Sequence, residues 1–197
     1  MTRSIQHAGC GRQLGALSCL LLLWLSSAWA LPLWQQELQR LRVGLNLFPA
    51  VLGAQEQLSA QRNADGVLEI VIVYRSTDKA AQQAVASLEA LSQVQGHPLR
   101  VSVLPIDQLE PDREPDREPP LAAIFVASSG LEPDLLRRLS ERHQVLVFSP
   151  FEGDVSAGAV AGIHVADRIL PSINLAQARR AGLSFQPFFL RVAHHAE

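Results

Sequence analysis

The sequence predicts an α/β fold: a single-domain three-layer sandwich with a mostly parallel sheet, an antiparallel edge hairpin and helices on both faces. Three short runs are predicted strands. Val67–Tyr74 and Leu121–Ala127 have the apolar character typical of interior strands, and Leu99–Ile106 alternates between apolar and polar residues. Helical patterns separate the strands, and this alternation indicates βαβ units with parallel pairing. Ala159–Ile173 is expected to add two short strands joined at Ala166-Asp167.

The mature chain is expected to begin with a helix over Trp34–Leu47. Its apolar residues recur at close to helical spacing: Trp34, Leu38, Leu41, Leu45 and Phe48. Pro49 should break or kink this helix, and Val51–Leu58 could resume it. Asn63–Gly66 is a turn signal that leads into the first strand.

The middle of the chain continues the alternation of helix and strand. Thr77 or Asp78 should cap a helix that runs towards Gly96 with one apolar stripe, formed by Ala81, Val85, Leu88 and Leu91. Residues 110–120 contain the repeat EPDR-EPDR, whose prolines and charges predict an exposed loop. Glu132–His143 should form the next helix and Gln144–Phe148 the next strand.

The C-terminal part reads as an edge hairpin followed by two helices. Pro171 cannot donate a ladder hydrogen bond, so the return strand Arg168–Ile173 should lie at a sheet edge. Asn174 should cap a helix that Gly182 ends in the left-handed conformation. Ser184 could cap a second helix with one apolar side, formed by Phe185, Phe188, Phe189 and Val192.

The N-terminus has the pattern of a signal peptide. Arg3 and Arg12 precede the apolar run Leu14–Leu25, and Ala28-Trp29-Ala30 is a small-x-small cleavage site. We therefore expect residues 1–30 to be removed after Ala30, which leaves a single domain over 31–197 in the periplasm. A lipid anchor on Cys19 and an uncleaved anchor are the alternatives.

Charge and cysteine content narrow the function further. Both cysteines, Cys10 and Cys19, lie in the predicted signal peptide, so the mature chain has no disulfide or thiolate chemistry. The net charge of −2 favours neither nucleic acid nor an anionic membrane surface. The histidine spacing predicts no metal site, and no serine stands in a nucleophile elbow. We expect a protein that is not an enzyme and has no cofactor.

A weaker pattern suggests a small ligand. Ser128 and Ser129 stand between a strand and a helix, where backbone amides could hold an anion. The segment lacks a Walker lysine and a glycine pattern, which favours the alternative, a plain connecting loop. Glu152 and Asp154 follow a strand end, where α/β sheets place ligands. They could bind a cationic or hydroxylated solute, or they could serve only to shape a turn.

Apolar residues near the C-terminus offer a candidate surface for a protein partner. The terminal helix has more large apolar side chains than one buried face requires. The candidate contact residues lie on this helix and on the edge hairpin: Phe185, Phe188, Phe189, Val192, Ile163 and Ile169. Core packing is the alternative explanation for the same residues.

The C-terminal motifs resemble those of the YfiR family of exported bacterial regulators. LAAIFVASSGLEPDLLRRLSERHQVLVFS is similar to the family's strand–Ser-Ser–helix–strand unit. The segment AGIHV and the signature that follows it are similar to the family's end, through Ile173, Asn174, Ala178, Gly182, Leu183, Phe189, Leu190 and Ala193. The mature chain lacks the family's cysteines, which argues against redox-triggered release.

This resemblance implies a periplasmic regulator that binds the periplasmic portion of a membrane-anchored diguanylate cyclase and restrains it. Cyclic-di-GMP signalling towards biofilm would then fall. From the apolar terminal helix and sheet edge we also expect a homodimer. The alternative function is a periplasmic small-solute-binding protein.

Overall fold

A computed structural model describes residues 30–75, 79–109 and 120–196. The predicted signal peptide up to Trp29 and residues 110–119 of the EPDR loop lie outside the described residues. The compact unit that contains the sheet begins at Leu38, and the chain before it forms a separate unit. The boundaries of the predicted domain, 31–197, stay a prediction.

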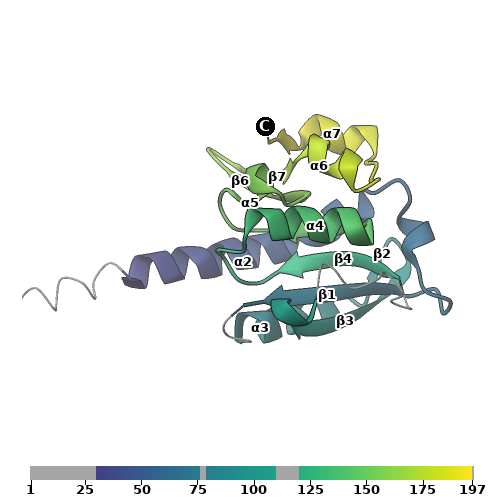
Figure 1. Cartoon of the computed structure of the whole chain (residues 1–197), viewed down its shortest axis with the longest axis horizontal. Helices are drawn as coiled ribbons and strands as arrows, with labels where there is room; N and C mark the ends of the chain where they lie inside the picture. The colour runs from purple at the N-terminus through teal and green to yellow at the C-terminus, as the bar shows by residue number, and fades with distance from the viewer. Residues whose placement is uncertain (1–29, 76–78, 110–119, 197) are drawn as a thin grey trace, which may run out of the picture. The chain divides into compact units, whose positions relative to one another are not determined.

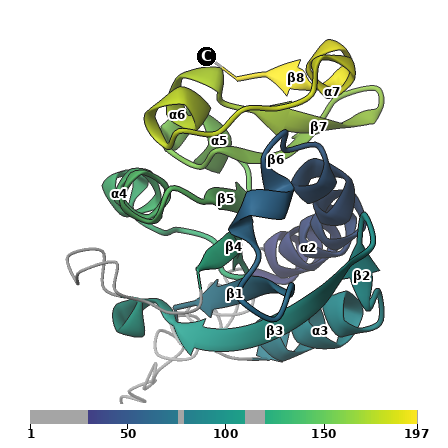
Figure 2. The ribbon, with the colours of Figure 1, turned by 90° about the vertical axis from the view of Figure 1, so that its right-hand side faces the viewer.

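The described residues form one eight-stranded sheet in the order β2-β3-β1-β4-β5-β6-β7-β8 (Figures 1 and 2). Its strands are β1 Leu68–Tyr74, β2 Gln93–Val94, β3 His97–Pro105, β4 Leu121–Val126, β5 Leu146–Ser149, β6 Ala161–Val165, β7 Ile169–Ile173 and β8 His194–His195. Strands β3, β1, β4, β5 and β6 are parallel, whereas β7 returns antiparallel to β6. The predicted α/β class and mostly parallel sheet are confirmed. The prediction that Pro171 places β7 at the sheet edge is wrong, because β8 pairs with β7 at Ser172 and Ile173, just beyond the proline.

Helices cover both faces of this sheet, with α4 on one side and α2 and α3 on the other (Figure 2). The α-helices are α2 Ala30–Gly53, α3 Lys79–Glu89, α4 Pro133–His143, α5 Asp154–Ala157, α6 Leu175–Arg180 and α7 Pro187–Val192. Leu68, Ile70 and Ile72 of β1 pack in the core that contains α2 and α3 residues. The alternate residues Val71 and Val73 pack with the buried leucines of α4.

Three phenylalanines join the helix α2 to the centre of the sheet. Phe48 of α2 meets Phe125 of β4 edge-on at 5.3 Å between ring centroids and Phe148 of β5 at 5.4 Å. Phe125 and Phe148 stack at 5.5 Å. All three side chains are essentially inaccessible to solvent, so this cluster fixes the position of α2 on the sheet.

The sequence predicted a break or a kink at Pro49, and the structure excludes the break. Helix α2 continues through Pro49 to Gly53, and a separate 3₁₀ turn follows at Leu58–Gln61. Phe48, Val51 and Leu52 are buried on either side of the proline. Tertiary packing of these side chains offsets the hydrogen bond that proline cannot make.

Short elements were not foreseen from the sequence. The strand β2 pairs antiparallel with β3 through a turn at Gly96, whose φ of 81° is left-handed. Helix α5 has only four residues, and β8 pairs with β7 over two residues. Elements this short have too few residues to show a periodicity in sequence.

Candidate functional site

The apolar C-terminal residues do not share one exposed face. Phe185 and Phe189 are buried in the main core, as is Ile163 of β6. The predicted helix start at Ser184 is wrong, because α7 begins at Pro187 and Gln186 is its N-cap. The carbonyl of Ser184 accepts a hydrogen bond from the Glu56 amide, and Phe185 bridges Gln55 in an extended conformation.

Two pairs of large apolar side chains in the C-terminal part of the described chain are exposed. Phe188 and Val192 of α7 are 55% and 57% exposed, and their spacing of four residues puts them on one side of the helix. Val165 and Ile169 are cross-strand partners at the tip of the β6–β7 hairpin and are 49% and 45% exposed. Of the six residues predicted to contact a partner, Phe188, Val192 and Ile169 are therefore accessible.

The local chemistry of the C-terminal region agrees with the sequence at two positions. The Asn174 side chain accepts a hydrogen bond from the Gln177 amide at 2.9 Å, which caps α6 as predicted. Its amide group also donates to the Val155 carbonyl at 2.9 Å. Gly182 follows α6 with a φ of 70°, the left-handed conformation expected of it.

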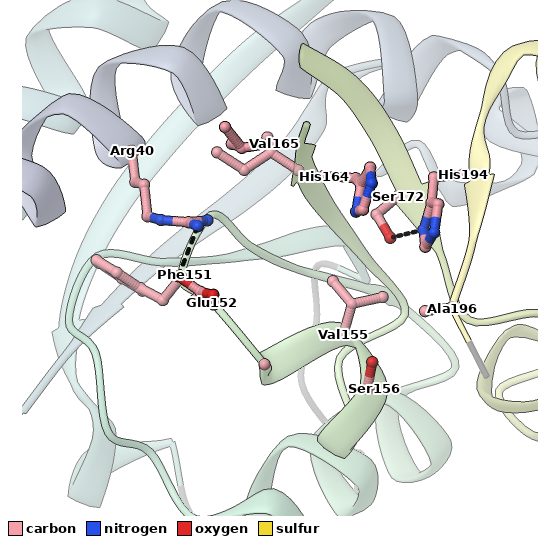
Figure 3. Close-up of a pocket in the computed structure, with 12 residues that line it drawn as sticks. Arg40, Phe151, Glu152, Val155, Ser156, His164, Val165, Ser172, His194 and Ala196 are labelled. Carbon is pink, nitrogen blue, oxygen red and sulfur yellow. Dashed lines mark hydrogen bonds and ion pairs between the residues drawn. The ribbon is translucent and has the colours of Figure 1, made fainter. Parts of the chain in front are cut away.

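A polar pocket of about 160 Å³ lies beside the β6–β7 hairpin (Figure 3). It is lined by residues that follow β5, by the end of β6, and by β7, β8 and α2. Its polar side chains are Arg40, Glu152, Ser156, His164, Ser172 and His194. The pocket therefore forms where the parallel strand β5 ends, which is the place at which α/β sheets commonly bind ligands.

An ion pair closes one side of this pocket. An Nη atom of Arg40 donates to Glu152 Oε2 at 2.8 Å. The Arg40 side chain is only 14% exposed, whereas that of Glu152 is 77% exposed. Glu152 can therefore turn towards solvent more easily than Arg40, which is held by its surroundings.

Two histidines form the opposite side of the pocket. The rings of His164 and His194 stack with a centroid separation of 3.7 Å and an interplanar angle of 3°. His194 Nδ1 lies 3.4 Å from Ser172 Oγ. Burial lowers the pKa of His194, and the positive charges that His164 and His195 acquire on protonation lower it further.

The four residues predicted to bind a small ligand are not brought together. Glu152 lines the pocket, but Ser128 follows β4, where its hydroxyl accepts a hydrogen bond from the Arg75 amide. Ser129 neighbours it outside the pocket lining. Asp154 is 8% exposed and its Oδ2 accepts a hydrogen bond from the Ser149 hydroxyl at 2.5 Å. Arg40 and the tail histidine His194 were not foreseen, because their proximity to His164 depends on the strand order.

Asp154 should make the stability of the protein depend on pH. Burial raises the pKa of this carboxyl group, although the hydrogen bond from Ser149 opposes the rise. When the pKa of a carboxyl group is higher in the folded protein than in the unfolded chain, its contribution to stability is fully present below the unfolded-state pKa. That contribution is lost as the pH rises through the folded-state pKa, because the buried group must then ionise. Asp154→Asn should therefore gain stability relative to the wild type between pH 4 and pH 7.5, measured by urea unfolding.

Asp134 provides the control for this experiment. It is exposed, and its hydrogen bond and ion pair with Arg137 lower its pKa. Asp134→Asn should show no such gain at neutral pH. An Asp154→Asn variant whose stability follows the wild type at every pH would contradict the assignment.

The described residues contain no group of three or more histidine, cysteine, aspartate or glutamate side chains arranged to hold a metal ion. Among the same residues, no helix is long and apolar enough to cross a membrane. The fold and the accessible groups thus define an α/β domain with a polar pocket and exposed apolar residues at one end of its sheet.

Comparison with known proteins identifies the family. The family model described as YfiR/HmsC-like matches residues 56–194, and the chain belongs to this family. Membership of this family supports a regulatory role. The matched region begins after α2, which ends at Gly53.

One solved structure supports the fold. The chain is similar to an ABC domain in complex with L-Trp from Streptococcus pneumonia, with 12% identity and a TM-score of 0.50. The likeness covers 74% of this chain and 60% of that one, so this chain spans less than two thirds of its structural neighbour. A search of the curated proteins gave no match.

Proposed function

We propose that this protein is a periplasmic, non-enzymatic regulator that binds a membrane-anchored signalling protein, such as a diguanylate cyclase, and restrains it. Family membership supports the regulatory role. The observation that carries the binding proposal is the exposed apolar pair Phe188 and Val192 on α7. A predicted signal peptide in residues 1–30 supports export.

The position of this pair favours a protein contact. Phe189, on the same helix, is buried in the core and anchors α7 to the sheet. The exposed Phe188 is thus held on a fixed helix, so less conformational entropy is lost when a partner covers it. Large apolar side chains presented in this way are the residues on which protein interfaces commonly depend.

Replacing both Phe188 and Val192 should weaken binding of the regulator to its partner. In Phe188→Ser/Val192→Ser, we expect capture of the membrane protein from solubilised inner membranes to fall by at least about tenfold, since each tenfold corresponds to about 1.4 kcal/mol. Because both side chains are exposed, the stability of the variant should stay within about 0.5 kcal/mol of the wild type. Capture is measured with tagged protein, and stability by urea unfolding.

A matched control comes from another exposed apolar residue. Leu91 follows α3 and is 41% exposed. Leu91→Ser should retain full capture, and the captured protein should be an inner-membrane protein with a periplasmic segment and a cyclase domain. In cells, the double variant should raise cyclic-di-GMP as deletion does. Equal capture by all three proteins would exclude α7 as the contact.

A homodimer is part of the same proposal. The pair Val165 and Ile169 at the hairpin tip offers a second apolar contact, separate in sequence from α7. Light scattering should then give a dimer for the wild type and a monomer for Ile169→Ser. A wild-type monomer at all accessible concentrations would remove the dimer from the proposal without affecting the partner contact.

The pocket beside the hairpin favours one alternative function, the binding of a small solute. Its volume of about 160 Å³ and its lining of Arg40, Glu152, His164 and His194 suit a compact polar molecule. A thermal-shift screen with small metabolites distinguishes the two functions. A ligand that stabilises the wild type but not Arg40→Ala would favour solute binding.

A further inference from the structure

We propose that acid detaches the C-terminal strand β8 from β7, because protonation of both His164 and His194 makes their stacked rings repel. The pairing of β8 with the edge of the sheet would then depend on pH. This inference does not depend on the proposed partner, since it concerns only the pairing of two strands within this chain.

The contacts that hold β8 are few. It pairs with β7 over only two positions, Ser172 with His194 and Ile173 with His195. The Ala196 amide then donates to the Ile173 carbonyl at 2.9 Å. His195 Nε2 lies 2.9 Å from the Leu190 carbonyl, which is a contact within the C-terminal segment itself. A strand this short depends strongly on each side chain that anchors it.

The main side-chain anchor of β8 is the stack of His194 on His164. With a centroid separation of 3.7 Å, the rings are in full face-to-face contact. Two neutral rings attract, and one imidazolium over a neutral ring is also favourable. Two imidazolium rings at this distance repel, because the Coulomb energy of like charges rises as their separation falls.

The surroundings of the stack do not cancel this repulsion. His195, on the same strand, adds a further positive charge in acid, and Ser172 on β7 is neutral. Arg40 of α2 and Glu152 after β5 line the same pocket, but they pair with one another at 2.8 Å. Within the described residues that line the pocket, Glu152 is the carboxylate, and it is already engaged by Arg40.

The sign of the pH dependence follows from the direction of the His194 shift. The pKa of His194 is lowered in the folded state. Because the His194 ring binds a proton more weakly when β8 is docked than when it is detached, acid favours the detached state. Docking of β8 is therefore strongest above the ordinary histidine pKa of about 6.5. Docking should weaken as the pH falls below that value, when the second histidine of the stack takes up its proton.

The test uses nuclear magnetic relaxation of the whole exported chain at pH 7.5 and pH 5. At pH 7.5 the backbone order parameter of Ala196 should be near that of a rigid backbone, about 0.85, and at pH 5 it should fall below about 0.6. The order parameters of β1 and β4 should stay high at both values, which separates local release from unfolding.

Two variants keep the stack but remove one charge. In His194→Phe and His164→Phe the aromatic contact remains, so Ala196 should stay ordered at pH 5. His97→Gln changes a histidine on β3 and should behave as the wild type. An ordered Ala196 in the wild type at pH 5 would overturn the proposal. So would equal loss of order in the wild type and in His194→Phe.

Discussion

Phe125→Ala should lower the free energy of unfolding by about 3–5 kcal/mol, the range found when buried aromatic residues are truncated. Phe125 is fully buried and touches both other rings of the aromatic cluster, Phe48 at 5.3 Å and Phe148 at 5.5 Å. Its removal leaves a cavity between α2 and the sheet that neither neighbour can fill without moving. Equilibrium urea unfolding measures this loss directly.

A second phenylalanine serves as the control for that experiment. Phe188→Ala removes the same side chain from a position that is 55% exposed, so it should change stability by no more than about 0.5 kcal/mol. Because a domain has only about 5–15 kcal/mol of stability in total, the core variant should also be less abundant in cells. Similar losses for both variants would show that the aromatic cluster does not dominate the core.

Gly162→Ala should destabilise the protein by more than about 3 kcal/mol, because its new methyl group meets backbone. A Cβ atom at this position would lie 2.0 Å from the Ser149 carbonyl oxygen and 2.6 Å from Cγ2 of Val155. Ser149 is the register partner of Gly162 across β5 and β6, so relief of the clash requires separation of the two strands. Thermal and urea unfolding both report this effect.

A glycine on an open surface provides the comparison. Gly130 has a φ of 71° and nothing within 4 Å of its would-be Cβ atom. Gly130→Ala should cost only about 1–2 kcal/mol, the cost of a left-handed conformation for an L residue. If Gly162→Ala were the milder of the two, β5 and β6 would not pair as closely as described. The effect on function would follow, because β6 carries His164 and half of the hairpin.

The sequence specified the features that depend on neighbouring residues. Continuous apolar runs identified β1 and β4 because these strands are buried on both faces, and the caps at Asn174 and Gly182 follow from the chemistry of one residue and its own backbone. Periodicity located α4 because Leu135, Leu136 and Leu139 recur at helical spacing. Apolar periodicity of this kind predicts a helix or strand wherever the fold buries one face of the element.

Glu69 is a buried charged residue for which the sequence indicates only one of two partners. It interrupts the apolar run of β1, yet it is 7% exposed, accepting hydrogen bonds from Asn63 at 3.0 Å and Arg100 at 2.7 Å. Asn63 comes from the preceding turn and could be anticipated as a neighbour. Arg100 lies opposite Glu69 on β3, so its role depends on the pairing of two strands that α3 separates in sequence.

The candidate site was decided by tertiary structure for the same reason. The sequence placed an excess of apolar residues near the C-terminus, but the segment around Gln55 determined that Phe185 is covered, while Phe188 is left exposed. The strand order brought His194 onto His164, thirty positions earlier in the chain, and put both beside Arg40. A local pattern reports that a face is apolar or that a helix is capped, whereas contacts between distant segments depend on how the whole sheet is assembled.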